Sequence, residues 1–182
     1  MPKSCCFIGH RKVACTNELI EKIDACLKSL VEKEDVRCFL FGDIGQFDTL
    51  CYERVTNLQA LYPDIKRIRL RCKSEYACQK EEKEELERIT RAVTGWDISY
   101  KDYKDYESVQ ISERVLQAGR ASYVERNEEM INASDFCVFY YNVDYLPPSQ
   151  SKSGTKIAFT YASKRKRSGA NIRIINLYEE NK

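Results

Sequence analysis

Hydrophobic residues along the chain form short continuous runs, which alternate with longer stretches of helical period. The runs predict five strands, at residues 4–8, 36–41, 65–70, 135–141 and 172–177. The third alternates in part, so we expect it to have a less buried face or to lie near an edge. Between them, apolar residues recur every three or four positions and predict amphipathic helices. One such face comprises Leu19, Ile20, Ile23, Cys26, Leu27, Leu30 and Val31. This alternation predicts an α/β domain with a mainly parallel sheet and right-handed crossovers.

Helices are expected at residues 16–35, 47–61, 74–92, 111–130 with a break near Gly119, and 155–166. Thr16 can cap the first of these, and the basic run 164–167 suits the carboxyl end of the last. The stretch 74–92 is rich in Lys and Glu, which predicts a solvated helix. Residues 96–106 are aromatic and acidic without a clean period, so we expect a loop or short edge strand whose tyrosines pack or stack on a ring. No linker or repeat divides the chain, and we expect residues 1–182 to form a single domain.

The amino-acid composition of the chain argues against some classes of function. The chain has 182 residues, 43% of them hydrophobic and 32% charged, with a formal net charge of +2. This charge is too balanced to imply a nucleic-acid partner by bulk electrostatics. No apolar stretch is long enough to span a bilayer and the start lacks a signal-peptide pattern, so we expect a cytoplasmic protein with no membrane partner.

The chain has nine cysteines and one histidine. The cysteine count is odd, no Cys-x-x-Cys occurs, and most of these cysteines lie inside apolar runs. We therefore expect reduced cysteines that serve as small hydrophobic residues, with no metal site and no bound cofactor. A redox role for Cys72 and Cys78 has no supporting pattern.

Three glycine-bearing turns are expected at the carboxyl edge of the sheet, where doubly wound folds bind ligands. They are Gly9-His10-Arg11, Gly42-Asp43-Ile44-Gly45 and Ser153-Gly154-Thr155. Each alone has a structural explanation: glycine permits a tight turn, and Ser153 or Thr155 can cap a helix. Together they place helix N-termini and Arg11 around one crevice, and their glycines let a ligand approach the backbone closely. Such a crevice suits a phosphate. Asp48, in the first turn of its helix, could hydrogen-bond backbone N–H groups or a ribose hydroxyl.

Four segments resemble, in order and spacing, the SLOG superfamily of Rossmann-like nucleotide-binding proteins, and most closely its YpsA-like branch. They are Phe7–Arg11, Phe41–Asp48, Arg126–Met130 with Ser134-Asp135, and Ser153–Thr155 with Tyr161-Ala162. The superfamily also includes the LOG (Lonely Guy) phosphoribohydrolases and the DprA DNA-processing proteins. The resemblance extends from Cys5 to Leu177. It implies a Rossmann-like, doubly wound, mainly parallel sheet with helices on both faces, a pocket for a nucleotide or nucleotide-derived ligand, and a possible homodimer.

Residue by residue, the resemblance assigns ligand contacts in four places. Gly9 and Arg11 match the first turn; Gly42, Gly45 and Asp48 match the second; Arg126 and Asn127 match a charged helix; Gly154 and Thr155 match a phosphate-contacting turn. With His10, Asp43 and Ser153 from the turns themselves, these are the predicted ligand-binding residues.

Two departures from the family pattern affect function. The second turn usually reads Gly-Gly-Ala-x-Gly-x-Asp, but Phe41 replaces the first glycine and Asp43 the alanine. A carboxylate at Asp43 would repel a phosphate there, and could instead bind a sugar hydroxyl or a cation. The LOG enzymes need a Glu where this chain has Ala158, which argues against that hydrolytic activity.

Three functions follow from these residues. The first is binding or sensing of a nucleotide-like ligand, with Arg11 and Arg126 as phosphate partners. The second is a hydrolase acting on an N-glycosidic or phosphate bond, with His10, Asp43 and Arg126 as catalytic candidates, although His10 could simply fix its turn. The third is a DprA-like single-stranded nucleic-acid binder. The basic stretches 66–73 and 164–167 favour it, and the balanced net charge argues against it.

Overall fold

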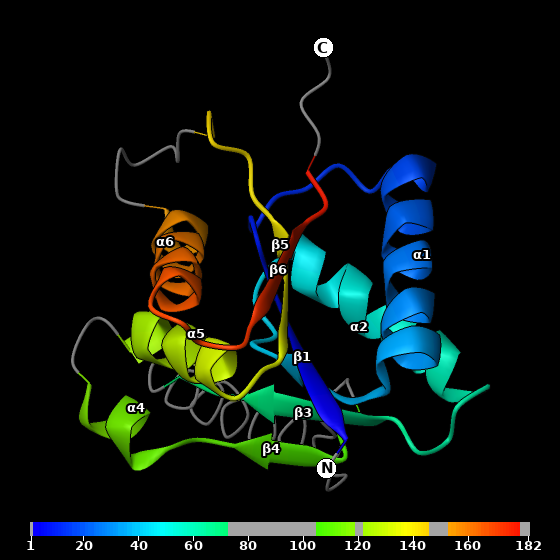
Figure 1. Cartoon of the computed structure of the whole chain (residues 1–182), viewed down its shortest axis with the longest axis horizontal. Coiled ribbons are helices and arrows are strands. Elements are labelled where there is room, and N and C mark those ends of the chain that lie inside the picture. The colour runs from blue at the N-terminus through cyan, green and yellow to red at the C-terminus, as the bar shows by residue number, and fades with distance from the viewer. Residues whose placement is uncertain (1, 73–104, 119–121, 146–152, 179–182) are drawn as a thin grey trace, which may run out of the picture.

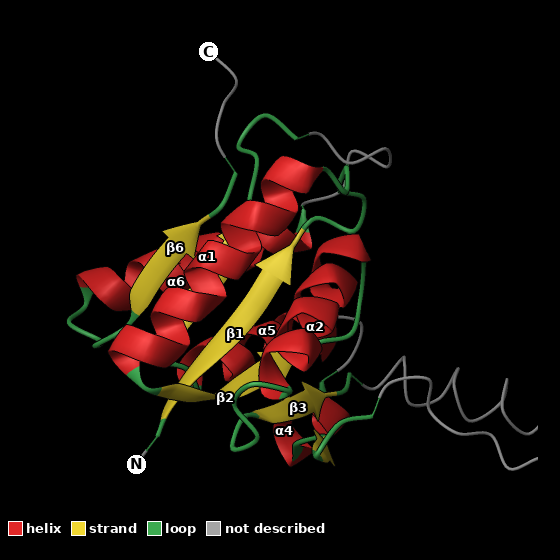
Figure 2. Ribbon diagram, turned by 90° about the vertical axis from the view of Figure 1, so that its right-hand side faces the viewer, coloured by secondary structure: helices red, strands yellow, loops and turns green. Residues whose placement is uncertain are grey.

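The computed structural model describes residues 2–72, 105–118, 122–145 and 153–178. Within these ranges the strands form one sheet in the order β4-β3-β2-β1-β5-β6, and every neighbouring pair is parallel. The strands are β1 (Lys3–Gly9), β2 (Val36–Phe41), β3 (Lys66–Leu70), β4 (Ser108–Gln110), β5 (Phe136–Tyr140) and β6 (Arg173–Asn176). Because all run the same way, their carboxyl ends share one edge, as the arrowheads of β1 and β6 indicate (Figure 2).

Helices cover both faces of this sheet (Figure 1). Helices α1 (Asn17–Glu34) and α2 (Gln46–Gln59) pack on one face, and α5 (Ser122–Asn132) and α6 (Gly154–Arg167) pack on the other. A short helix, α4 (Glu113–Gln117), lies beside α5. This arrangement confirms the predicted α/β fold with its Rossmann-like, doubly wound sheet. No helix in the described ranges has both the length and the apolar composition to cross a membrane.

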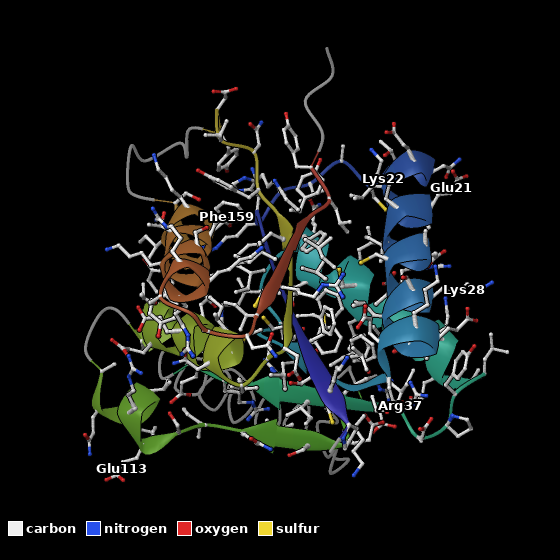
Figure 3. The ribbon with its side chains drawn as sticks, viewed as in Figure 1. Glu21, Lys22, Lys28, Arg37, Glu113 and Phe159 are labelled. Carbon is white, nitrogen blue, oxygen red and sulfur yellow. The ribbon has the colours of Figure 1, made fainter. Side chains whose placement is uncertain are left out.

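The hydrophobic core lies on both sides of β1. Cys5 and Phe7 point to the side of α1 and α2, whereas Cys6 and Ile8 point to the side of α5 and α6. A strand buried on both faces needs apolar side chains at every position, which explains the continuous run in the sequence. Helix α6 contributes Phe159, whose ring meets Phe139 edge to face at 5.1 Å (Figure 3).

Most predicted elements appear within a residue or two of their expected bounds. The expected helix over 111–130 is present as α4 and α5, and residues 119–121 between them lie outside the described ranges. The expected helix at 74–92 and most of the aromatic stretch 96–106 also lie outside those ranges. Thr16 caps α1 and accepts a hydrogen bond from the Leu19 N–H at 3.2 Å. Five described cysteines are buried, namely Cys5, Cys6, Cys51, Cys72 and Cys137.

The edge strand β4 was not predicted. It has only three residues, two of them exposed, so it leaves no apolar run in the sequence. An ion pair holds its start against β3: Arg67 Nη2 donates to Glu107 Oε1 at 2.6 Å, and Arg67 Nη1 donates to Thr56 of α2 at 2.9 Å. Arg67 and Arg69 are both buried, and together they occupy the α2 face of β3. Arg67 and Arg69 are therefore more deeply buried than Ile68 and Leu70 of the same strand, whereas Lys66 is exposed.

Candidate functional site

The order of the strands reverses at β1, because β2 and β5 flank it on opposite sides. Loops after β1 and β5 diverge at such a point and leave space for ligands. Here His10 joins these two loops: its Nε2 accepts a hydrogen bond from the Asn142 N–H at 3.0 Å, and its ring lies 4.2 Å from that of Tyr145. Burial lowers the pKa of His10, which keeps the imidazole neutral and able to accept. His10 therefore has the turn-fixing role that the sequence left open.

The first and second glycine turns lie side by side, as expected. The Gln46 N–H donates to the Arg11 carbonyl at 2.9 Å, and the Gln46 Oε1 accepts from the Val13 N–H at 2.8 Å. Gly45 has φ of +93°, and a Cβ there would lie 2.7 Å from the Arg11 Cα. Both the backbone conformation and the close approach require glycine at this position.

A cavity of about 370 Å³ opens between these two turns. One wall is the segment that follows β1, and the other is the amino-terminal half of α2, so the cavity lies at the carboxyl edge of the sheet. Its lining residues are Arg11, Val13, Cys15, Gly45, Gln46, Thr49, Leu50 and Glu53. Arg11 and Cys15 are exposed, whereas Val13 and Leu50 are buried and give the cavity an apolar surface.

Asp43 is in the left-handed conformation, with φ of +57°, and its carboxylate faces the interior. Arg69 Nη2 lies 3.2 Å from Asp43 Oδ2, and both side chains are largely buried. The Arg69 guanidinium also lies 6.0 Å from the ring centre of Tyr106. Burial, together with the negative charges of Asp43 and Asp48, raises the pKa of Tyr106. The positive charge of Arg69 offsets the negative charge of Asp43. The repulsion that the sequence predicts between Asp43 and a phosphate is therefore reduced.

Arg126 supports the second turn from the opposite face of the sheet. It is buried in α5, and its Nη1 donates to the Gly42 carbonyl at 2.8 Å. Its Nη2 donates to the Asn127 Oδ1 at 3.1 Å. A Cβ at position 42 would lie 2.7 Å from the Arg126 Cζ, so glycine at this position makes room for the guanidinium. Neither Arg126 nor Asn127 lines the cavity of about 370 Å³.

The third turn, Ser153-Gly154-Thr155, leads into α6, and Ser153 is the N-cap residue of this helix. The Ser153 hydroxyl accepts from the Lys156 N–H at 3.4 Å, and Thr155 is buried. A Cβ on Gly154 would lie 3.2 Å from the Tyr123 ring. Ala158 is buried in the core, so the position where LOG enzymes carry their Glu does not face the cavity. The cavity lining includes none of Ser153, Gly154 and Thr155.

Of the predicted ligand-binding residues, the structure brings Arg11 and Gly45 to the cavity. Gly9 packs against Phe47, where a Cβ would lie 2.4 Å from that ring, and Asp48 is buried in the first turn of α2. The sequence analysis missed the α2 wall of the cavity, formed by Gln46, Thr49, Leu50 and Glu53. The signal was present, because these residues are spaced so that they share one side of a helix.

Comparison with known proteins adds no family: no protein-family model matches the chain, and no curated protein matches it. The resemblance to the SLOG superfamily therefore stays a prediction from the sequence. Among the described residues, no group of three or more His, Cys, Asp or Glu side chains is arranged to hold a metal ion. The chemistry that the site offers is one exposed cation, a helix N-terminus, an apolar surface and one carboxylate.

Proposed function

We propose that this protein binds a nucleotide or a nucleotide-derived small ligand in the cavity between Arg11 and α2. The observation that carries the proposal is the position of this cavity, where the loop after β1 meets the N-terminus of α2 at the carboxyl edge of the sheet. Its volume of about 370 Å³ lies within the range of small-molecule sites, about 300–1,000 Å³. The predicted resemblance to nucleotide-binding proteins supports the same ligand class.

The chemistry of the lining suits such a ligand. A phosphate would lie near the exposed Arg11 and the N-terminus of α2. The Gln46 N–H there donates to the Arg11 carbonyl, and the N-cap, Gly45, has no side chain to accept from the N–H groups that follow. The apolar surface of Val13 and Leu50 would contact a base or sugar. Binding is favoured over turnover because His10, Asp43 and Arg126, the catalytic candidates, are engaged in contacts that hold the turns. A cytoplasmic location and a homodimer stay predictions from the sequence.

A thermal-shift screen against nucleoside mono-, di- and triphosphates, cyclic nucleotides and ADP-ribose tests the proposal. A ligand at ~100 times its dissociation constant should stabilise the fold by about 2.7 kcal/mol. The Arg11→Ala variant should bind the same ligand about 10- to 100-fold more weakly, because it loses a charged hydrogen-bond partner. Lys28→Ala removes one positive charge from the outer side of α1 (Figure 3) and should leave the affinity unchanged. The proposal fails if the whole panel leaves the melting temperature unchanged, or if Arg11→Ala binds as tightly as the unaltered protein.

A further inference from the structure

The two ends of the cavity differ in charge. The α2 wall consists of Gln46, Thr49, Leu50 and Glu53. These are positions i, i+3, i+4 and i+7, so they form one stripe along the helix. With a rise of about 1.5 Å per residue, Gln46 and Glu53 are about 10 Å apart along the helix axis. Arg11 lies at the Gln46 end, since its backbone touches both Gly45 and Gln46. The cavity therefore runs from a cation and a helix N-terminus to a carboxylate.

The carboxylate of Glu53 is available to a ligand. It is exposed, and although its charge helps to raise the pKa of the neighbouring Arg54, that guanidinium donates to another residue: Arg54 Nε and Nη2 each donate to the Asp24 carboxylate at 2.6 Å. In the part of the chain that the structure describes, Glu53 has no ion-pair partner. A carboxylate at pH 7 can accept hydrogen bonds but cannot donate them.

We infer that Glu53 makes the cavity selective for nucleotides whose base carries an exocyclic amino group. This inference rests on the proposed function, because it takes the phosphate to lie at the Arg11 end. The base then points along α2 toward Glu53. An amino group, as in adenine or cytosine, donates to the carboxylate. An oxo group at the same ring position, as in hypoxanthine or uracil, places two acceptors face to face, and the ring N–H beside it reaches the carboxylate only if the base shifts.

Matched nucleotide pairs test this selectivity, because within each pair an oxo group replaces the amino group and the adjacent ring nitrogen gains a proton. Isothermal titration calorimetry with AMP and IMP, and with CMP and UMP, should give an amino-to-oxo affinity ratio of about 10 or more for the unaltered protein. In Glu53→Gln the ratio should fall to about 1–3, since an amide can donate to an oxo group as well as accept from an amino group. Glu21→Gln, which removes an exposed carboxylate from the outer side of α1, should keep the original ratio (Figure 3).

The Arg11→Ala variant separates this inference from the proposed function. It should weaken the binding of AMP and of IMP by the same factor and leave the ratio of the two affinities unchanged, because Arg11 lies at the other end of the cavity. If nucleotides bind and depend on Arg11 but the unaltered protein does not discriminate within the pairs, the inference is wrong and the proposed function stands. If Glu53→Gln retains the full discrimination, another residue selects the base and the inference is again wrong. Absence of binding by all four nucleotides overturns the inference, and the proposed function fails with it only if the wider nucleotide panel also leaves the melting temperature unchanged.

Discussion

Replacing Glu107 with Gln should weaken the attachment of β4 to the rest of the sheet. The Glu107 carboxylate accepts hydrogen bonds from the Arg67 guanidinium, from the Arg67 backbone N–H and from Gln59 Nε2. Arg67 is buried, with a side chain only 6% exposed. Loss of the carboxylate charge leaves this guanidinium with a weaker acceptor in a region of little water.

The size of the effect follows from the pKa of Glu107. Burial acts to raise this pKa, but the hydrogen bonds from Arg67 and Gln59 together lower it from 4.5 to about 2. At about 1.36 kcal/mol for each pH unit, this difference corresponds to about 3.4 kcal/mol. The Glu107 side chain is 34% exposed, and solvent screening reduces the contribution, so we expect Glu107→Gln to lower the free energy of unfolding by roughly 2 kcal/mol at pH 7.

Urea unfolding between pH 7 and pH 2 measures this contribution. Because the pKa is lower in the folded protein, the stabilisation is fully present above about pH 4.5 and is lost as the pH falls toward about 2. In Glu107→Gln this component of the acid dependence should be absent. Glu21→Gln serves as the control, since Glu21 is exposed on α1. The reasoning is refuted if Glu107→Gln is as stable as the control at pH 7 and shows the same acid dependence.

Two further substitutions test the construction of the turns. Gly9→Ala would bring a Cβ within 2.4 Å of the buried Phe47 ring, and should lower the free energy of unfolding by about 1–3 kcal/mol. This loss is measured as a lower urea midpoint. An unchanged midpoint would mean that α2 shifts freely. Ser153→Ala removes the cap of α6 and should lower the free energy of unfolding by about 1 kcal/mol, whereas Ser153→Asp should retain most of the stability. Equal losses in the two variants would contradict the capping role.

The sequence predicted the fold well where burial produces a regular pattern. The apolar run of β1 is continuous because the strand is covered on both faces, and the amphipathic face of α1 is regular because only one side of that helix meets the sheet. It failed at β4, where three residues are held by an ion pair and not by apolar burial. It also did not anticipate that Arg67 and Arg69 of β3 are buried, because the partners that satisfy them, Glu107 and Asp43, come from distant parts of the chain.

The candidate site could be predicted in part for the same physical reason. Turns after parallel strands must meet at one edge, so the sequence located Arg11 and Gly45 correctly at that edge. It could not show which side chains stabilise the turns and which line the cavity. Arg126 reaches the Gly42 carbonyl across 84 residues of sequence, and this contact depends on the packing of α5. The sequence places Glu53 on the same side of a helix as Gln46, Thr49 and Leu50, but only the fold puts the loop after β1 opposite these residues.

The most direct test of nucleotide binding in this cavity uses Cys15, an exposed thiol in its lining. Buried thiols such as Cys5 and Cys51 react slowly, because burial raises their pKa. The rate of Cys15 alkylation by a maleimide can be followed by peptide mass spectrometry, with the partly exposed Cys38 of β2 as an internal control. A saturating nucleotide should slow alkylation of Cys15 several-fold and leave that of Cys38 unchanged. An unchanged Cys15 rate in the presence of a nucleotide known to be bound would place the ligand elsewhere and contradict the account.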